Sequence, residues 1–221
     1  MEYRSVPISH VIRDINRQYY LPAIQREFVW DLEQIERLFD SIMGDFPIGS
    51  FLFWKVEEDH KDDWAVYEFI RKFDEEHPHN PLADLKGINR DIHLVLDGQQ
   101  RLTALYIGLK GSYRYHYYRW RVANLYLNLL KPPTLNEDDP EESRYQFEFR
   151  EDDSPEDANK ELWYKVGRIL DFEDAEDAKA DAKRLLADLP EKAQENAKTL
   201  IGRLHTRIHT FCIINYYEEK T

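Results

Sequence analysis

The sequence has a single cysteine, no excess of positive charge and no long apolar run. Cys212 has no second cysteine with which to pair, so no intrachain disulfide can form and a reducing compartment is expected. No stretch approaches the roughly 20 apolar residues that cross a bilayer, and the N-terminus lacks a basic region followed by an apolar core. These absences predict a soluble, cytoplasmic protein with no membrane partner.

Positive charge is scarce, because 30 Lys and Arg residues stand against 43 Asp and Glu residues and give a formal net charge of -13. Such a surface repels a phosphate backbone over most of its area, so any contact with nucleic acid is expected to be local. The chain is nevertheless 42% hydrophobic and 14% aromatic, and its 221 residues suffice for one sizeable core. We therefore expect one main folded domain.

Hydrophobic periodicity predicts helices and strands in alternation. The clearest helix covers residues 31–43, where Asp31 is the expected N-cap and Gln34 completes a capping box. Further helices are expected near residues 65–76, 98–111, 175–189 and 191–208, and strands near residues 48–56, 92–96, 122–130, 144–150 and 209–217. This mixture predicts an α+β fold.

The most informative stretch is DGQQR at residues 97–101, where an apolar run ends and a helical pattern begins. A glycine turn that opens a helix directs free backbone N–H groups and the positive end of the helix dipole at one point, where an anion can bind. The Arg101 guanidinium can hold two phosphate oxygens, and the Gln99 and Gln100 amides can donate to an oxygen or orient a water. Asp97 can hold Mg²⁺ through water or accept a proton from an attacking water.

A structural explanation of the same turn stays open. Asp97 would then cap the helix, Gly98 would supply a backbone conformation that other residues avoid, and Arg101 would pair with a nearby acid. A second stretch, LPAIQREFVW at residues 21–30, favours a binding site, because Gln25 and Arg26 also precede a helix. We therefore expect a site built from two helix N-termini around one polyanion.

Three stretches in this order, at residues 21–42, 46–56 and 93–111, resemble the N-terminal domain of GmrSD-type modification-dependent restriction systems. The resemblance rests on DGQQR and on a box formed by Gln25, Arg26, Val29 and Trp30. It implies a ParB/sulfiredoxin-like fold, in which a mixed sheet with helices is followed by a helical extension. The expected nucleotide-binding core covers residues 1–130, and residues 131–221 form a strand and helical extension of the same domain.

The resemblance also implies an activity, namely Mg²⁺-dependent binding and hydrolysis of a nucleoside triphosphate, coupled to recognition of modified DNA. No thiol lies in the DGQQR turn and no Walker-type GKS or GKT sequence is present, so the site is expected to be of the ParB kind. The implied nucleotide-binding residues are Gln25, Arg26, Gly98, Gln99, Gln100, Arg101 and Thr103. Asp97, Gln100 and Arg101 are the implied catalytic residues, and Asp97 is the implied metal ligand.

The implied partners are modified DNA, a His-Asn-His nuclease domain or subunit, and a second copy of the chain. No such nuclease domain precedes Thr221, so nuclease activity is not predicted for this chain alone. The same observation leads us to expect a chain that is truncated at its C-terminus or one subunit of a split system.

The stretch KGSYRYHYYRWR at residues 110–121 contains no acid and interleaves basic with aromatic side chains. Such a pattern is typical of nucleic-acid contacts, in which cations meet phosphates and rings stack on bases. Arg114, Tyr117, Arg119 and Arg121 are the expected nucleic-acid-binding residues. The alternative is a strand edge whose tyrosines cover the core and whose arginines pair with acidic neighbours.

Two rival functions stay open. A reader of DNA modification, or an assembly module, would use residues 110–121 and would not need Asp97. A direct ParB-like nuclease would need clustered metal-binding carboxylates, and the sequence offers Asp97 beside acidic stretches that look like solvated loops.

Overall fold

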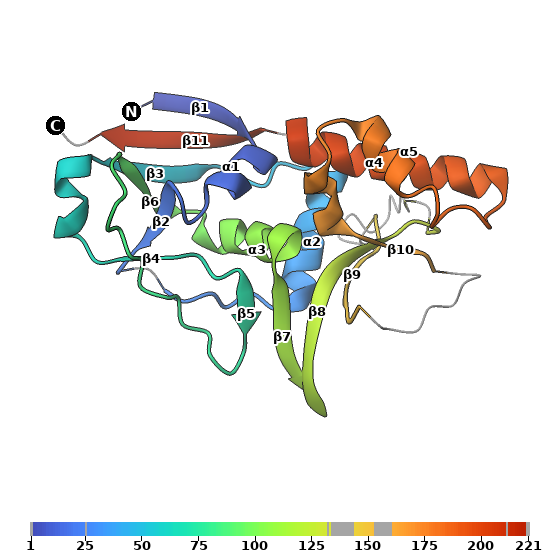
Figure 1. Cartoon of the computed structure of the whole chain (residues 1–221), viewed down its shortest axis with the longest axis horizontal. Helices are drawn as coiled ribbons and strands as arrows, with labels where there is room; N and C mark the ends of the chain where they lie inside the picture. The colour runs from blue at the N-terminus through green and yellow to red at the C-terminus, as the bar shows by residue number, and fades with distance from the viewer. Residues whose placement is uncertain are drawn as a thin grey trace.

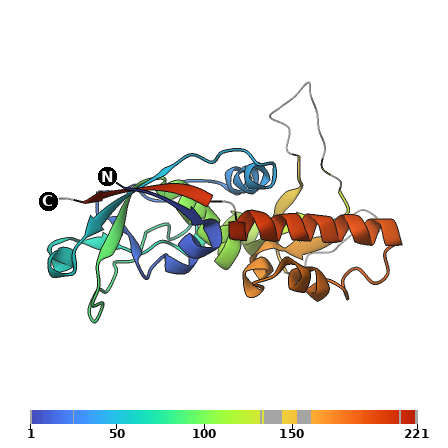
Figure 2. The same cartoon turned by 90° about the horizontal axis from the view of Figure 1, so that it is seen from above.

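Two mixed β-sheets with helices beside them form the described part of the chain, and the expected α+β fold class is confirmed (Figure 1). The computed structural model describes residues 2–24, 26–131, 133, 144–152, 161–210 and 212–219. The larger sheet has the strand order β1 (Glu2–Pro7), β11 (Cys212–Glu219), β3 (Phe51–Val56), β6 (Ile92–Asp97), β2 (Tyr19–Pro22) and β4 (Val66–Tyr67). The first and last strands of the chain therefore lie side by side, and both termini lie at one end of the molecule (Figures 1 and 2).

The smaller sheet lies on the far side of the central helices. Its strand order is β10 (Trp163–Lys165), β8 (Arg119–Asn128), β7 (Ser112–Tyr117) and β5 (Lys72–Asp74), and β9 (Phe147–Arg150) also pairs with β8. The antiparallel hairpin of β7 and β8 extends away from the body of the molecule (Figure 1).

The helices are α1 (Ile8–Asp14), α2 (Leu32–Met43), α3 (Gln99–Lys110), α4 (Ala175–Asp181) and α5 (Glu191–Thr210), with 3₁₀ segments at Glu58–Asp63 and Val166–Asp171. The long helix α5 packs against α4 and runs along the long axis, away from the larger sheet (Figure 2). Among the described residues, no helix is long and apolar enough to cross a bilayer.

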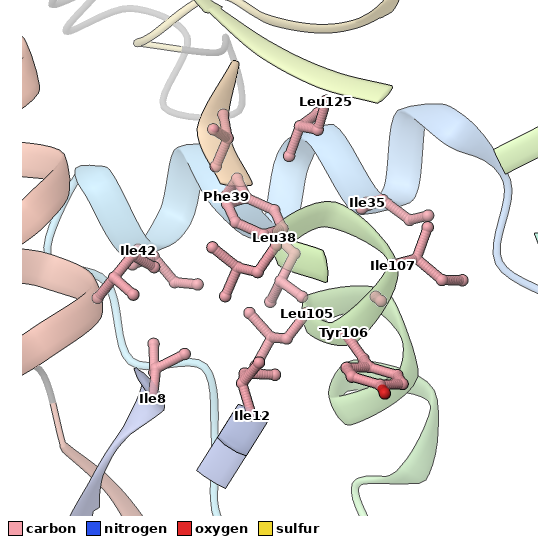
Figure 3. Packing of buried hydrophobic residues seen from close by; sticks show 14 of the residues in the cluster. Ile8, Ile12, Ile35, Leu38, Phe39, Ile42, Leu105, Tyr106, Ile107 and Leu125 are labelled. Atoms are coloured by element: carbon pink, nitrogen blue, oxygen red, sulfur yellow. The ribbon is translucent and has the colours of Figure 1, made fainter. Parts of the chain in front are cut away.

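The core is a continuous cluster in which α3 packs against α1, α2, β7 and β8. Close packing of this kind removes apolar surface from water, at about 25 cal/mol per Å². Ile35, Phe39 and Ile42 of α2 are fully buried, and Leu105 and Ile107 of α3 face the same cluster (Figure 3). The result is that α3 is fixed along its length, and its N-terminus is placed by the core.

Most of the expected elements are present, and one prediction was wrong. The capping box of α2 is confirmed, because Asp31 accepts from the backbone N–H of Gln34 and the Gln34 side chain accepts in return. The helix expected near residues 65–76 is absent, since β4 and β5 lie there. Each pairs with a distant strand, β4 with β2 and β5 with β7, and such pairing overrides local helical spacing.

A second helix was predicted too long. The helix expected at residues 175–189 ends at Asp181, and turns follow it. Within α4 only Ala178 is buried, so this charged segment has little apolar face to stabilise further turns. The closing strand is present as β11. The side chain of Cys212 lies outside what the structure describes.

Candidate functional site

The N-terminus of α3 has no side-chain cap, as the anion-site hypothesis requires. Gly98 is its N-cap, with φ 87° and ψ 7°, and no side chain caps the helix. Asp97 therefore does not cap α3, but the other two parts of the structural explanation hold, because Gly98 has a positive φ and Arg101 lies 3.5 Å from Asp97. The first backbone N–H groups of a helix have no partner within the helix, and at α3 they lie beside the buried residues Gly98, Gln99 and Gln100 at the end of β6.

Gly98 is required here for two reasons. Its positive φ is a conformation that other residues rarely adopt, and a Cβ at this position would lie 2.3 Å from Cδ1 of Phe51. The strand β3 therefore passes so close to the turn that any side chain would displace it.

The two glutamines of the turn point inward and hold a neighbouring backbone segment. The Gln100 amide donates from Nε2 to the Glu27 carbonyl over 2.9 Å, and its Oε1 accepts from the Val29 N–H over 3.0 Å. Gln99 donates from Nε2 to the Arg26 carbonyl over 3.4 Å. Both side chains are buried, so the structure uses them to attach residues 26–29 to the start of α3.

One atom of this arrangement lacks a partner within the described residues. Oε1 of Gln99 is buried and accepts no hydrogen bond from a described residue. The residue as a whole is 8% exposed. A buried acceptor without a donor costs about 1 to 3 kcal/mol. A donor from a ligand or a water would remove that cost.

Arg101 lies against the loop between α2 and β3. Its Nη1 donates to the Ile48 carbonyl over 2.6 Å, its Nη2 lies 3.5 Å from Oδ2 of Asp97, and its guanidinium lies 4.7 Å from the centre of the Phe51 ring. The side chain remains 23% exposed. A guanidinium has five N–H donors, so these contacts orient Arg101 and leave donors for an anion.

Asp97 is the most accessible group of the turn. Its side chain is 72% exposed and touches Arg101 through one oxygen only. A solvated carboxylate at the end of a strand can hold Mg²⁺ through water, which is the usual way in which proteins bind this ion. The residues present therefore fit the expected metal without enclosing it.

The remaining nucleotide-binding residues from the sequence are placed unequally. Arg26 is exposed, whereas Thr103 is buried at 3% exposure on α3 and does not face solvent. Gln25 lies outside the described residues. Arg26 and Glu27 line a cavity of about 330 Å³.

The walls of this cavity include residues that the sequence analysis missed, namely Tyr67, His79 and Asn80. Tyr67 lies on β4 and the other two belong to a turn cluster, so no spacing in the sequence connects them with the DGQQR turn. A contact between the His79 ring and the Glu27 carboxylate also closes one side of the cavity.

The second helix of the expected two-helix site is occupied by its own cap. Asp31 accepts from the Gln34 N–H over 2.8 Å at the start of α2, so this N-terminus already faces a carboxylate. The described geometry therefore favours a site with one open helix end, that of α3, together with the segment at residues 26–29.

The hairpin expected to contact nucleic acid has its arginines paired. Arg114 donates to Asp74 over 2.6 Å and to Glu76 over 2.9 Å. Arg119 and Arg121 both pair with Glu151, at 2.9 and 3.4 Å. These pairs agree with the strand-edge alternative, and they leave the aromatic side chains, among them Tyr117 at 55% and Tyr118 at 90% exposure, as the accessible part of the hairpin.

A group of potential metal ligands also lies beside this hairpin. Asp74, Glu76 and His77 could each direct one ligand atom to a common point. The Arg114 guanidinium lies against both carboxylates, and its fixed positive charge repels a cation there.

The fold and the site define a class of protein. It is an α+β domain in which an uncapped helix N-terminus lies next to a buried pair of glutamines. Residues 8–221 match the family model described as GmrSD restriction endonuclease, N-terminal domain, and the chain belongs to this family.

The chain is also similar to a protein of another organism. Over 89 residues the chain is 36% identical to an uncharacterised protein of Methanocaldococcus jannaschii. The matched region covers 40% of this chain and 14% of that protein, so the chain spans a small part of its relative's length.

Proposed function

We propose that this chain is the nucleoside-triphosphate-binding and hydrolysing domain of its restriction system, with the phosphates at the N-terminus of α3. The observation that carries the proposal is the uncapped helix end at Gly98, three residues before Arg101, whose guanidinium keeps donors beyond its bond to the Ile48 carbonyl. Membership of the GmrSD N-terminal family supports the same assignment. In an acidic chain, an uncapped helix N-terminus followed by an arginine is suited to a polyanion.

Each residue of the turn has a separate role in this proposal. The backbone of Gly98, Gln99 and Gln100 binds phosphate oxygens, and Arg101 binds them from the side of the Ile48 loop. The side chains of Gln99 and Gln100 position the segment at residues 26–29, through the bonds to the Arg26, Glu27 and Val29 backbone. The free Oε1 of Gln99 accepts from the bound nucleotide or its water.

Asp97 and Mg²⁺ supply the chemistry of hydrolysis. When bound, Mg²⁺ would supply positive charge next to the phosphate oxygens. Asp97 is placed to hold that ion through water or to accept a proton from the attacking water. Its high exposure leaves room for both the ion and its water ligands.

The cavity beside residues 26 and 27 is suited to the rest of the nucleotide. At about 330 Å³ it has the size of a small-molecule site, and Tyr67, His79 and Asn80 offer a ring and polar groups to a base and ribose. Arg26 connects this cavity with the turn, because it lines the cavity and its backbone carbonyl accepts from Gln99.

The experiment that tests the proposal is calorimetric titration of the chain with ATP, GTP, CTP and UTP in the presence of Mg²⁺. Saturable binding of at least one nucleotide is expected, and Arg101→Ala should weaken it at least tenfold. Arg37→Ala is the matched control, since Arg37 is an exposed arginine that pairs with Glu33 on α2. If Arg101→Ala binds as tightly as the wild type, the phosphates are not at this turn.

A second variant separates binding from turnover. Asp97→Asn keeps the size of the side chain but removes its charge. Nucleotide binding measured without Mg²⁺ should therefore persist, and phosphate release measured with Mg²⁺ should be lost. Retention of full turnover in Asp97→Asn would refute the role of Asp97.

A second candidate function, a non-catalytic reader of modified DNA, is favoured by the β7–β8 hairpin. Tyr117 and Tyr118 are exposed near the tip of a hairpin that extends from the body, and exposed rings can stack on bases (Figure 1). In a reader, Tyr118→Ala would reduce DNA binding while Asp97→Asn would leave it unchanged. In a restriction component that couples nucleotide hydrolysis to modified DNA and to a nuclease partner, both Tyr118→Ala and Asp97→Asn would reduce function.

A further inference from the structure

A basic cavity lies at the opposite end of α3 from the DGQQR turn. Its volume is about 500 Å³, and its walls carry the cations Arg71, Lys110, Lys165 and Arg168. Among the described residues that line it, Asp171 is the sole acid. In a chain with a net charge of -13, four cations around one cavity are unexpected for a solvated surface.

Two of these cations have carboxylate partners and two do not. Lys165 lies 3.3 Å from Asp152 and Arg168 lies 2.6 Å from Asp181. Arg71 and Lys110 form no ion pair with any described residue. Arg71 donates from Nε to the Lys110 carbonyl over 2.6 Å, which leaves its two terminal amino groups without an acceptor in the described part of the chain.

The end of α1 and the residues after it bring further positive charge close to Lys110. The Lys110 ammonium lies 3.5 Å from the Ile12 carbonyl, next to Arg13 in the last turn of α1. Burial lowers the pKa of Lys110, and the positive charges of Arg17, Arg71 and Arg13 lower it further, against Asp14 alone. These cations therefore repel one another, and Asp14 offsets part of that repulsion.

Stabilisation of helix ends explains only part of this cluster. The C-terminus of α3 carries about half a negative charge, and a single cation such as Arg71 would balance it. The cluster instead includes Arg13, Arg17, Arg71 and Lys110 with none of them in an ion pair within the described residues. An external anion would offset the mutual repulsion of these groups.

We propose that this cavity binds phosphate groups, with Arg71 and Lys110 as the principal contacts and Arg13 and Arg17 beside them. A guanidinium presents paired donors to phosphate oxygens and an ammonium acts as a point charge, so the two residue types are the usual phosphate ligands. The source is a phosphodiester backbone or a free polyphosphate, and the experiment distinguishes them. The chemistry required is the same for both.

The inference goes beyond the proposed function, because the two sites lie at opposite ends of one helix. The twelve residues of α3 span roughly 18 Å at 1.5 Å per residue, so a phosphate at one end does not reach the other. The failure of one proposal therefore leaves the other intact.

The test compares charge-removing variants at two places. The variant Arg71→Gln/Lys110→Gln removes two unpaired cations of the cavity. The control Arg37→Gln/Lys192→Gln removes the same net charge from exposed positions on α2 and α5. Binding is measured by fluorescence anisotropy of a labelled DNA duplex of roughly 20 base pairs and by calorimetry with inorganic tripolyphosphate, at several salt concentrations.

If the phosphates belong to a backbone, duplex affinity should fall at least tenfold in the cavity variant and remain within about twofold in the control. The slope of log affinity against log salt should fall by about 2, since each lost phosphate contact contributes about 0.9. If the phosphates are free, the Arg101→Ala variant should still bind tripolyphosphate, and Arg101→Ala combined with Arg71→Gln/Lys110→Gln should lose that binding.

Two further measurements keep the proposal falsifiable. Arg71→Lys/Lys110→Arg preserves both charges and should retain binding, whereas a purely structural role of the residues predicts loss in both double variants. Nucleotide binding at the DGQQR turn should be unchanged in the cavity variant. The proposal is overturned if the wild type binds neither probe, or if the cavity and control variants bind alike.

Discussion

Gly49→Ala should displace Arg101 without changing any residue of the DGQQR turn. A Cβ at Gly49 would lie 2.4 Å from Nη1 of Arg101, about 1 Å inside ordinary contact. Since the guanidinium is the far end of a flexible side chain, it should move and lose its bond to the Ile48 carbonyl. A hydrogen bond from a charged group contributes about 1.5 to 3 kcal/mol.

Gly87→Ala provides a matched control for this substitution. Both glycines have φ 82°, so both substitutions carry the same backbone strain of about 1 kcal/mol. At Gly87 an added Cβ would meet nothing within 4 Å. The difference between the variants therefore isolates the displacement of Arg101.

Thermal unfolding followed by circular dichroism measures that difference. For a domain of this size, 1 kcal/mol shifts the Tm by about 2 to 4 °C. Gly49→Ala should unfold about 5 to 15 °C below the wild type, and Gly87→Ala about 2 to 4 °C below it. Calorimetry should also show weaker nucleotide binding in Gly49→Ala alone. Equal Tm values for the two variants would refute the packing of Arg101 against this loop.

Three further outcomes are expected. Gln100→Leu removes the hydrogen bonds to the Glu27 carbonyl and the Val29 N–H, so the free energy of unfolding measured in urea should fall by about 2 to 4 kcal/mol. The control Gln194→Leu removes one bond to the Leu189 carbonyl, so it should lower the free energy of unfolding less and leave nucleotide binding unchanged. Asp31→Ala removes the cap of α2 and should cost about 1 kcal/mol in the same assay, and a loss below the error of the measurement would contradict the cap. Burial raises the pKa of Glu36 to about 7, so the folded state binds this proton more tightly than the unfolded state and stability should fall as the pH rises from about 4.5 to 7. Glu36→Gln can still accept from the Phe149 N–H, and it should flatten that part of the profile of stability against pH. After allowance for solvent screening, it should stabilise the protein at pH 8 by about 1 to 2 kcal/mol. An unchanged profile would show that Glu36 is not responsible.

Local patterns in the sequence were sufficient for several elements. The capping box at Asp31 and Gln34, the apolar run before Asp97 and the helix after Gly98 are encoded within a few residues, so they could be predicted. The family could also be recognised from short motifs, since these residues are adjacent in the chain. In contrast, β4 and β5 are strands because of partners far away in the sequence.

The candidate site divides in the same way. The sequence by itself determined that a glycine turn with Asp97 and Arg101 opens α3, because the required backbone conformation and the charges belong to adjacent residues. Only the tertiary structure decided that Gln99 and Gln100 turn inward to hold residues 26–29, that the arginines of the β7–β8 hairpin are paired, and that Arg71 meets Lys110. Side-chain direction and charge pairing depend on which distant segments pack together, and packing is a property of the whole core.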